Sequence, residues 1–326
     1  MIYVKIYKKS GMHLLLNKHH LLIDPLSHQE SDIVLISHAH SDHISLPSFG
    51  KFTQPIYLSQ PTLEILGIRS KKEFKDKENI HLLKSGDEVN LDGISIQAFE
   101  AGHCIGSLQF KITYNQKTII YTGDFSLEAR MGMQKGEVLK GKNATLITDS
   151  TYANKKYIFP TRIEIYKEIL NWIKSVLKKD KIAVLFARAL GTGQELTDLI
   201  NNSTLNCELW VHPSIYFHNL IHDNYYPIGE FQYRRSFFDK SLDDYFYPKK
   251  SKDQPKKVYL LPIYMCNQKN LPELKDYYGR DALAICTGWA LTQRFSIQSF
   301  ALSSHADYNN IQRYFTESGA RDLIYF

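Results

Sequence analysis

Residues 38–43 read HAHSDH, so four of six consecutive side chains are common metal ligands. The string follows the apolar run 33–36 after a single serine, and we expect a buried strand to end where the ligands begin. Imidazole nitrogens and carboxylate oxygens both suit zinc-like cations. We therefore predict that His38 and His40 serve one ion and that Asp42 and His43 serve another. A surface histidine cluster is the competing interpretation, which the strand-end position disfavours.

Two later strand ends supply the further ligands that such a site needs. His103 comes shortly after the apolar run 94–98, and Asp124 shortly after the run 119–121. A third histidine completes the set for the first ion, and a carboxylate can bridge two cations held roughly 3.5–4 Å apart. The three segments together predict a two-metal centre.

The apolar pattern changes near residue 153, which indicates two structural units. Before it, short apolar runs separated by turn residues predict stacked sheets with few helices, and glycines at 85–87 and 91–93 predict hairpin turns. Beyond Pro160, apolar residues recur at helical spacing over 163–177, followed by a strand at 182–186 and a helix at 194–200. The second unit is therefore predicted to be α/β.

Composition indicates the class of protein and its compartment, but it does not identify a reaction. The 326 residues are 43 % hydrophobic and 23 % charged, and no apolar run approaches the ~20 residues that span a bilayer. The start of the chain does not have the pattern of a signal peptide, so we expect a cytoplasmic protein with no membrane partner. Four scattered cysteines without a C-x-x-C pair predict neither disulfides nor a cysteine zinc site. A net charge of +6 favours an anionic substrate.

The segment 225–264 is rich in aromatic and basic residues. Such residues can stack on exposed bases, but aromatic clusters in an α/β unit more often belong to the core. We therefore favour the core interpretation.

At the positions named so far the sequence resembles the metallo-β-lactamase superfamily, whose signature elements correspond in order and spacing to Asp24, the string 38–43, His103 and Asp124. The resemblance implies an αββα sandwich in which Asp124 bridges two metal ions and Asp24 orients the ligands through hydrogen bonds. The implied metal ligands are His38, His40, Asp42, His43, His103 and Asp124.

Two further segments, 148–152 and 301–308, resemble motifs of the β-CASP nuclease branch, where an acidic residue and a histidine support the metal centre. The resemblance assigns Asp149 and His305, with Asp42, to catalysis. It implies a metallo-β-lactamase domain formed by residues 1–153 and 300–326, with an inserted α/β β-CASP domain at 154–299. Within the branch, the chain resembles compact exonuclease-like proteins of archaea and bacteria and enzymes of messenger-RNA 3′-end processing.

The function implied is a metal-dependent nuclease that hydrolyses phosphodiester bonds of DNA or RNA, with exonuclease-like processing of single strands. Two divalent ions, zinc or manganese, would activate the reaction, and His305 held by Asp149 would donate a proton to the leaving oxygen or stabilise the charge developing there. Ser303 and Ser304 are candidate phosphate contacts and equally candidate turn residues. In messenger-RNA-type members a further ligand histidine follows the strand after His305, so we expect the second ion to lack one ligand in this sequence.

Two alternatives stay open. A small-molecule metallo-hydrolase of the glyoxalase or lactamase type would use the same first metal ligands, but the motifs at Asp149 and His305 and the long insert argue against it. A non-catalytic subunit of a nucleic-acid processing complex is the other alternative. Retention of all the metal ligands argues against that one.

Overall fold

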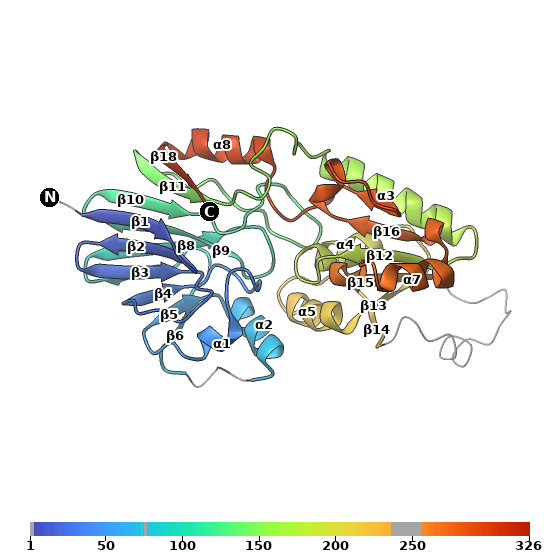
Figure 1. The fold of residues 1–326 in the computed structure, drawn as a ribbon, viewed down its shortest axis with the longest axis horizontal. Coiled ribbons are helices and arrows are strands. Elements are labelled where there is room, and N and C mark those ends of the chain that lie inside the picture. Colours follow the sequence, from blue (N-terminus) through green and yellow to red (C-terminus); the bar gives the residue numbers. More distant parts are fainter. Residues whose placement is uncertain (1–2, 73, 75–76, 236–255) are drawn as a thin grey trace. The chain divides into compact units, whose positions relative to one another are not determined.

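The computed structural model describes residues 3–72, 74, 77–235 and 256–326, and the chain divides into two compact units (Figure 1). Unit 1 comprises residues 1–129, 134–158 and 304–326, and unit 2 comprises 130–133 and 159–303. Within the aromatic and basic segment, residues 236–255 lie outside the described residues. Among the helices that are described, none has the length and apolar character needed to cross a membrane.

Unit 1 contains two six-stranded sheets. In the first, β1 to β3 are antiparallel and β3 to β6 are parallel. Its strands are β1 (Val4–Lys8), β2 (Met12–Leu16), β3 (His19–Ile23), β4 (Ile33–Leu35), β5 (Ile56–Leu58) and β6 (Ile80–Leu82). The second sheet has the order β18-β11-β10-β9-β8-β7. Its strands are β7 (Glu88–Leu91), β8 (Ile94–Glu100), β9 (Leu108–Tyr114), β10 (Lys117–Tyr121), β11 (Ala144–Thr148) and β18 (Ala320–Tyr325).

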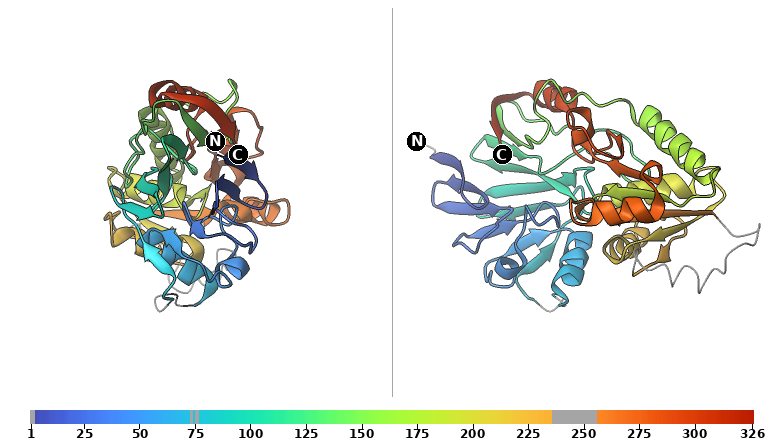
Figure 2. Two further views of the ribbon diagram at one scale, coloured as in Figure 1. Left: turned by 90° about the vertical axis from the view of Figure 1, so that its left-hand side faces the viewer. Right: turned by 45° about the vertical axis from the view of Figure 1, so that its right-hand side comes forward.

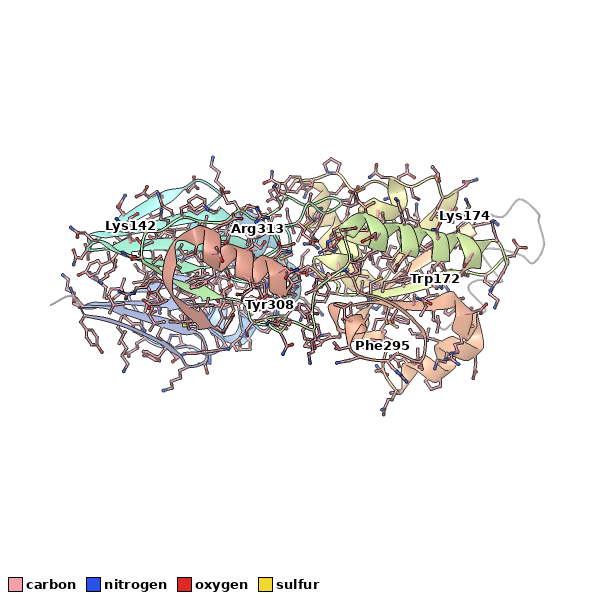
Figure 3. All side chains as sticks on the ribbon, turned by 90° about the horizontal axis from the view of Figure 1, so that it is seen from above. Lys142, Trp172, Lys174, Phe295, Tyr308 and Arg313 are labelled. Atoms are coloured by element: carbon pink, nitrogen blue, oxygen red, sulfur yellow. The ribbon has the colours of Figure 1, made fainter. Side chains whose placement is uncertain are left out.

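The two sheets pack face to face and helices lie on their outer faces (Figure 1, Figure 2). Alternate residues of β2 to β4 and of β8 to β10 form one buried cluster, which includes Leu14, Leu35, Phe110 and Ile112. Against the second sheet, α8 (Tyr308–Ser318) packs Ile311 and Tyr314, and Figure 3 shows this helix from outside, with Tyr308 and Arg313 labelled. The predicted α/β fold with an αββα sandwich is confirmed.

Of the two hairpin turns predicted in unit 1, one is wrong and the other is confirmed. The glycine turn at 85–87 does not close a hairpin, because it joins β6 of the first sheet to β7 of the second. The turn at 91–93 does close the β7–β8 hairpin, and both Asp92 and Gly93 have the positive φ that a type I′ turn needs.

Helices in unit 1 were expected to be sparse, but besides the short α1 (Leu46–Phe49) the structure has the 11-residue α2 (Gln60–Ser70). Its N-terminus is capped by Ser59, which accepts a bond from the Thr62 amide, and Lys71 ends it with left-handed backbone. The buried face of α2 includes the polar Thr62, while the apolar Ile68 is exposed, so the apolar pattern of the sequence did not mark this helix.

Unit 2 is the predicted α/β structure, built on a parallel sheet in the order β14-β13-β15-β12-β16-β17. The strands are β12 (Ala183–Ala187), β13 (Cys207–Val211), β14 (Gln232–Tyr233), β15 (Lys256–Pro262), β16 (Leu283–Cys286) and β17 (Gln298–Phe300). The described helices that accompany it are α3 (Arg162–Leu177), α4 (Thr192–Asn201), α5 (Pro213–Asp223) and α7 (Asn270–Tyr278), with short 3-10 turns at Ile263–Met265, Arg280–Ala282 and Gly288–Leu291.

The helix predicted over 163–177 is α3, which begins with a capping box between Thr161 and Glu164. Its inner face adds Ile165, Ile169 and Ile173 to the core around β12 and β15. Trp172 and Lys174 of this helix are labelled in Figure 3.

Candidate metal centre

The predicted ligands of unit 1 follow the carboxyl ends of strands that run in the same direction. In the second sheet β8, β10 and β11 are mutually parallel, because β9 is antiparallel to both β8 and β10 and β11 is parallel to β10. His103, Asp124 and Asp149 follow these three strands. The string 38–43 follows β4 of the first sheet in the same way. This topology gathers residues from distant parts of the sequence at one edge of the sandwich.

Four of the predicted ligands form one group. His38, His40, His103 and Asp124 each offer a ligand atom, and these atoms lie within 4.8 Å of one another. Nδ1 of His40 lies 2.9 Å from Nε2 of His38 and 3.0 Å from Nε2 of His103. Oδ2 of Asp124 lies 3.6 Å and 3.4 Å from the same two Nε2 atoms. Three imidazole nitrogens and one carboxylate oxygen form a donor set that fits a tetrahedral zinc ion.

Hydrogen bonds fix which nitrogen of two imidazoles faces the group. His103 donates from Nδ1 to the carbonyl of Ser304 at 3.1 Å, since a carbonyl can only accept. The Ser37 hydroxyl gives its proton to Asp24 at 2.6 Å, so it accepts from Nδ1 of His38 at 3.0 Å. In the neutral form of each ring, the nitrogen that faces Asp124 is then the proton-free Nε2. Burial, with a further contribution from the neighbouring imidazoles, lowers the pKa of His38 well below its usual value, which keeps that ring neutral.

Asp124, Asp149 and His305 form a second group that could hold a metal ion. Nδ1 of His305 lies 2.7 Å from Oδ2 of Asp149 and 3.7 Å from Oδ2 of Asp124. Burial of Asp149 opposes its ionisation, but the charge of His305 and hydrogen bonds from His305 and the Thr151 amide outweigh it and lower the pKa of Asp149. Asp124 thus belongs to both groups.

Asp24 lies where an orienting residue was predicted. Its Oδ2 accepts from Ser37 Oγ, from the Tyr121 hydroxyl at 2.7 Å and from Nδ1 of His43 at 2.8 Å, and its Oδ1 accepts from the Ser37 amide at 2.7 Å. His43 in turn places Nε2 3.2 Å from Oδ1 of Asp124. Burial disfavours the charged form of His43, yet Asp124 and Asp24 together raise the pKa of His43 well above its usual value.

Asp42 is exposed and belongs to neither of the two groups found among the described residues, so its assignment as a ligand stays a prediction. Its charge acts on Arg69 of α2, whose guanidinium donates to the carbonyl of Ala39. Burial lowers the pKa of Arg69, and Asp42 opposes that shift.

The serines proposed as phosphate contacts take part through their backbone. Ser303 and Ser304 are buried, and their carbonyl oxygens accept from Arg162 and His103, respectively. A phosphate contact by either side chain stays a prediction.

Sequence reasoning did not identify Ser37, Tyr121 or Arg69 as parts of the site. Ser37 precedes the ligand string and could have been suspected from that position. Tyr121 ends the strand that precedes Asp124 and Arg69 lies on α2, but neither position indicated which group of the site the side chain would bind.

Residues 14–184 match the family model described as a beta-lactamase superfamily domain. The chain belongs to the metallo-β-lactamase superfamily. It is 28 % identical over 184 residues to an RNase J-like protein of Methanocaldococcus jannaschii. This match covers 52 % of the present chain and 44 % of the relative. It is also 32 % identical over 139 residues to the DNA cross-link repair 1A protein of Mus musculus. That match covers 42 % of the present chain and 13 % of the relative.

These relatives confirm the resemblance to the β-CASP branch, although the matches span less than half the length of either relative. A solved structure of a protein of unknown function from Enterococcus faecalis V583 is similar over 99 % of this chain and 93 % of its own, with a TM-score of 0.62. At 13 % identity this likeness shows a shared fold alone. Nucleases of the superfamily bind divalent metals, and the two groups of side chains described above could hold them.

Proposed function

We propose that this chain hydrolyses phosphodiester bonds of DNA or RNA in a metal-dependent reaction and processes single strands from an end. One observation carries the proposal. Asp124 belongs both to the group with three histidines and to the group with Asp149 and His305, so ligands for a cation and a proton-transferring pair meet at one carboxylate. The relatives include an RNase J-like protein and a DNA cross-link repair protein, which supports a nucleic-acid substrate.

We assign one divalent ion to the group of His38, His40, His103 and Asp124. A second ion is assigned to Asp124 with Asp42 and His43, and zinc suits this histidine-rich donor set better than manganese. When bound, such ions neutralise the anionic phosphate and make water a stronger nucleophile at neutral pH.

His305 serves as the general acid in this proposal. Its Nδ1 is held by Asp149 at 2.7 Å, so proton transfer to the leaving oxygen uses the other ring nitrogen, Nε2. Asp149 stabilises the protonated ring before the transfer, because its own pKa is lowered and it carries negative charge at neutral pH. The pair therefore delivers a proton at the position where charge develops on the leaving group.

The proposal is tested with purified protein and 5′-labelled single-stranded DNA and RNA of one sequence, each with zinc, manganese or chelator. His40→Ala removes one ligand of the first group, and His81→Ala is the matched control. His81 is an exposed histidine of β6 that stacks on Tyr57 and lies outside both groups. We expect metal-dependent shortening of at least one substrate, lost in His40→Ala and kept in His81→Ala. A circular single strand should resist cleavage if the enzyme acts from an end.

Two results would contradict the proposal. Shortening that survives both the chelator and His40→Ala would come from another source. Failure to cleave either substrate, with metal binding intact, would favour the small-molecule hydrolase instead.

A further inference from the structure

Glu195 of α4 is a buried carboxylate that lies outside the metal centre. It is 0 % exposed and is paired with two buried arginines, Arg130 and Arg162. Arg130 donates to Oε2 from Nε at 2.9 Å and from Nη2 at 2.7 Å, and Arg162 donates to Oε1 from Nη1 at 3.0 Å. The Tyr166 hydroxyl also donates to Oε1, at 2.6 Å.

The helix that carries Glu195 is itself firmly held. The Gln194 side chain accepts from the Gly191 amide at 2.7 Å and donates to Asn219 at 2.8 Å and to the Ala189 carbonyl at 3.0 Å. Glu195 therefore presents a fixed charge to its partners. The two arginines hold the pKa of Glu195 below its usual value although burial acts in the opposite direction.

The partners of Glu195 lie on the segments where the chain passes between the two units. Arg130 belongs to the short segment 130–133 of unit 2, which is preceded and followed by residues of unit 1. Arg162 comes three residues after the chain enters unit 2 again at Phe159. Arg162 also donates to the carbonyl of Ser303, the last residue before the chain returns to unit 1.

The next two residues belong to the metal centre. The carbonyl of Ser304 accepts from Nδ1 of His103, and His305 pairs with Asp149. Because Ser303 and Ser304 share a peptide bond, the orientation of the Ser303 carbonyl limits the positions open to the Ser304 carbonyl. The Ala306 amide, which donates to the Phe125 carbonyl at 2.7 Å, anchors the other side of His305.

We infer that Glu195 and Arg162 are positioning residues of the metal centre: Arg162, held by Glu195, fixes the Ser303 carbonyl and thereby the Ser304 carbonyl that orients His103. The inference rests on the metal-dependent function proposed above. The competing view is that the Ala306 anchor suffices and that the buried ion pairs only stabilise unit 2.

The decisive comparison is between Arg162→Lys and Arg130→Lys. Both variants keep a buried positive charge beside Glu195, but a lysine lacks the forked donors that let Arg162 reach Glu195 and Ser303 at once. Arg162 donates to the Ser303 carbonyl, whereas Arg130 donates to Oε2 of Glu195. We therefore expect both variants to lose thermal stability and Arg162→Lys to disturb His103.

The readouts are the affinity of the chain for Zn²⁺ in a chelator competition and the visible spectrum of the Co²⁺-loaded chain. Neither needs a substrate. We expect Arg162→Lys to bind Zn²⁺ about tenfold more weakly and to show a changed Co²⁺ spectrum, as loss of a hydrogen bond to a ligating histidine does elsewhere. Arg130→Lys should keep the affinity and spectrum of the unsubstituted chain.

Glu195→Gln provides a second test, since it removes the charge that holds Arg162 and should resemble Arg162→Lys. If it does not fold, the lysine pair still decides. Equal affinities and spectra in the two lysine variants would overturn the inference, whether both match the unsubstituted chain or both depart from it. A different result would separate the two proposals. If the unsubstituted chain shows no nuclease activity, while the Co²⁺ spectrum changes in Arg162→Lys and not in Arg130→Lys, the proposed function is contradicted and the positioning role is supported.

Discussion

Asp24→Asn isolates the contribution of one buried charge to the metal centre. Asp24 has φ of 51°, a left-handed conformation that asparagine also tolerates, so the substitution adds little backbone strain. The carboxylate accepts four hydrogen bonds, three on Oδ2 and one on Oδ1. An asparagine that keeps its oxygen toward the three donors must turn its NH₂ group toward the Ser37 amide, which is itself a donor.

The expected loss of stability in Asp24→Asn follows from the number of hydrogen bonds that Asp24 accepts. Hydrogen bonds to a charged group contribute about 1.5–3 kcal/mol each, and the variant loses one of them and weakens the others. We therefore expect the free energy of unfolding of the metal-free protein to fall by about 2–4 kcal/mol. Because Asp24 orients His43 directly and His38 through Ser37, Zn²⁺ affinity should fall roughly 10- to 100-fold.

Urea unfolding of the metal-free chain and a chelator competition with Zn²⁺ measure the two effects. Asp32→Asn is the matched control, since Asp32 is exposed and accepts a bond from the His20 amide. It should leave Zn²⁺ affinity unchanged. The reasoning is refuted if Asp24→Asn unfolds at the same urea concentration and binds Zn²⁺ as tightly as the control.

Three further predictions follow from the same structure. His305→Ala should lower kcat about 10²- to 10⁴-fold while Zn²⁺ affinity stays within a few-fold, and a large loss of affinity would make His305 a ligand instead. Burial raises the pKa of Glu100 to about 7, so unfolding releases its proton between pH 4.5 and 7 and stability falls as pH rises through that window. Urea titrations of the metal-free chain at pH 5 and pH 8 measure this effect against Glu100→Gln. Between the two pH values, the free energy of unfolding should fall by up to about 3 kcal/mol more in the unsubstituted protein than in the variant, and an equal fall in both would contradict this. Gly102→Ala should unfold the loop of His103 or prevent soluble expression, since its Cβ would lie 2.3 Å from the Gly136 nitrogen at a φ of +74°; a stable variant with normal Zn²⁺ affinity would argue against that loop conformation.

Local patterns in the sequence predicted much of the fold. The β8 and β10 strands were visible as apolar runs, and the helix α3 appeared through its regular apolar spacing. The predicted ligands His38, His103 and Asp124 could be placed at strand ends because parallel strands bring such ends to one edge of a sheet. The α2 helix was missed because its buried face includes Thr62 while Ile68 is exposed. The turn at 85–87 was misjudged because a local glycine signal cannot distinguish a hairpin from a connection between two sheets.

What the sequence could not supply are partnerships between distant side chains. Tyr121 and Asp24 are separated by 97 residues, and Arg130 and Glu195 by 65. A buried tyrosine or arginine has no local pattern that names its partner. Such residues become recognisable only after the fold has brought their donors and acceptors together.

The discontinuous build of unit 1 has a consequence for the newly made chain. The bond from His103 to Ser304 spans 201 residues, and the pair of His305 and Asp149 spans 156. At a synthesis rate of about 5–20 residues per second, roughly 10–40 s pass between the emergence of His103 and that of its orienting carbonyl. During that interval the newly made chain carries the predicted metal ligands but not His305. Under the function proposed above, the site is therefore incomplete until residue 305 has been made.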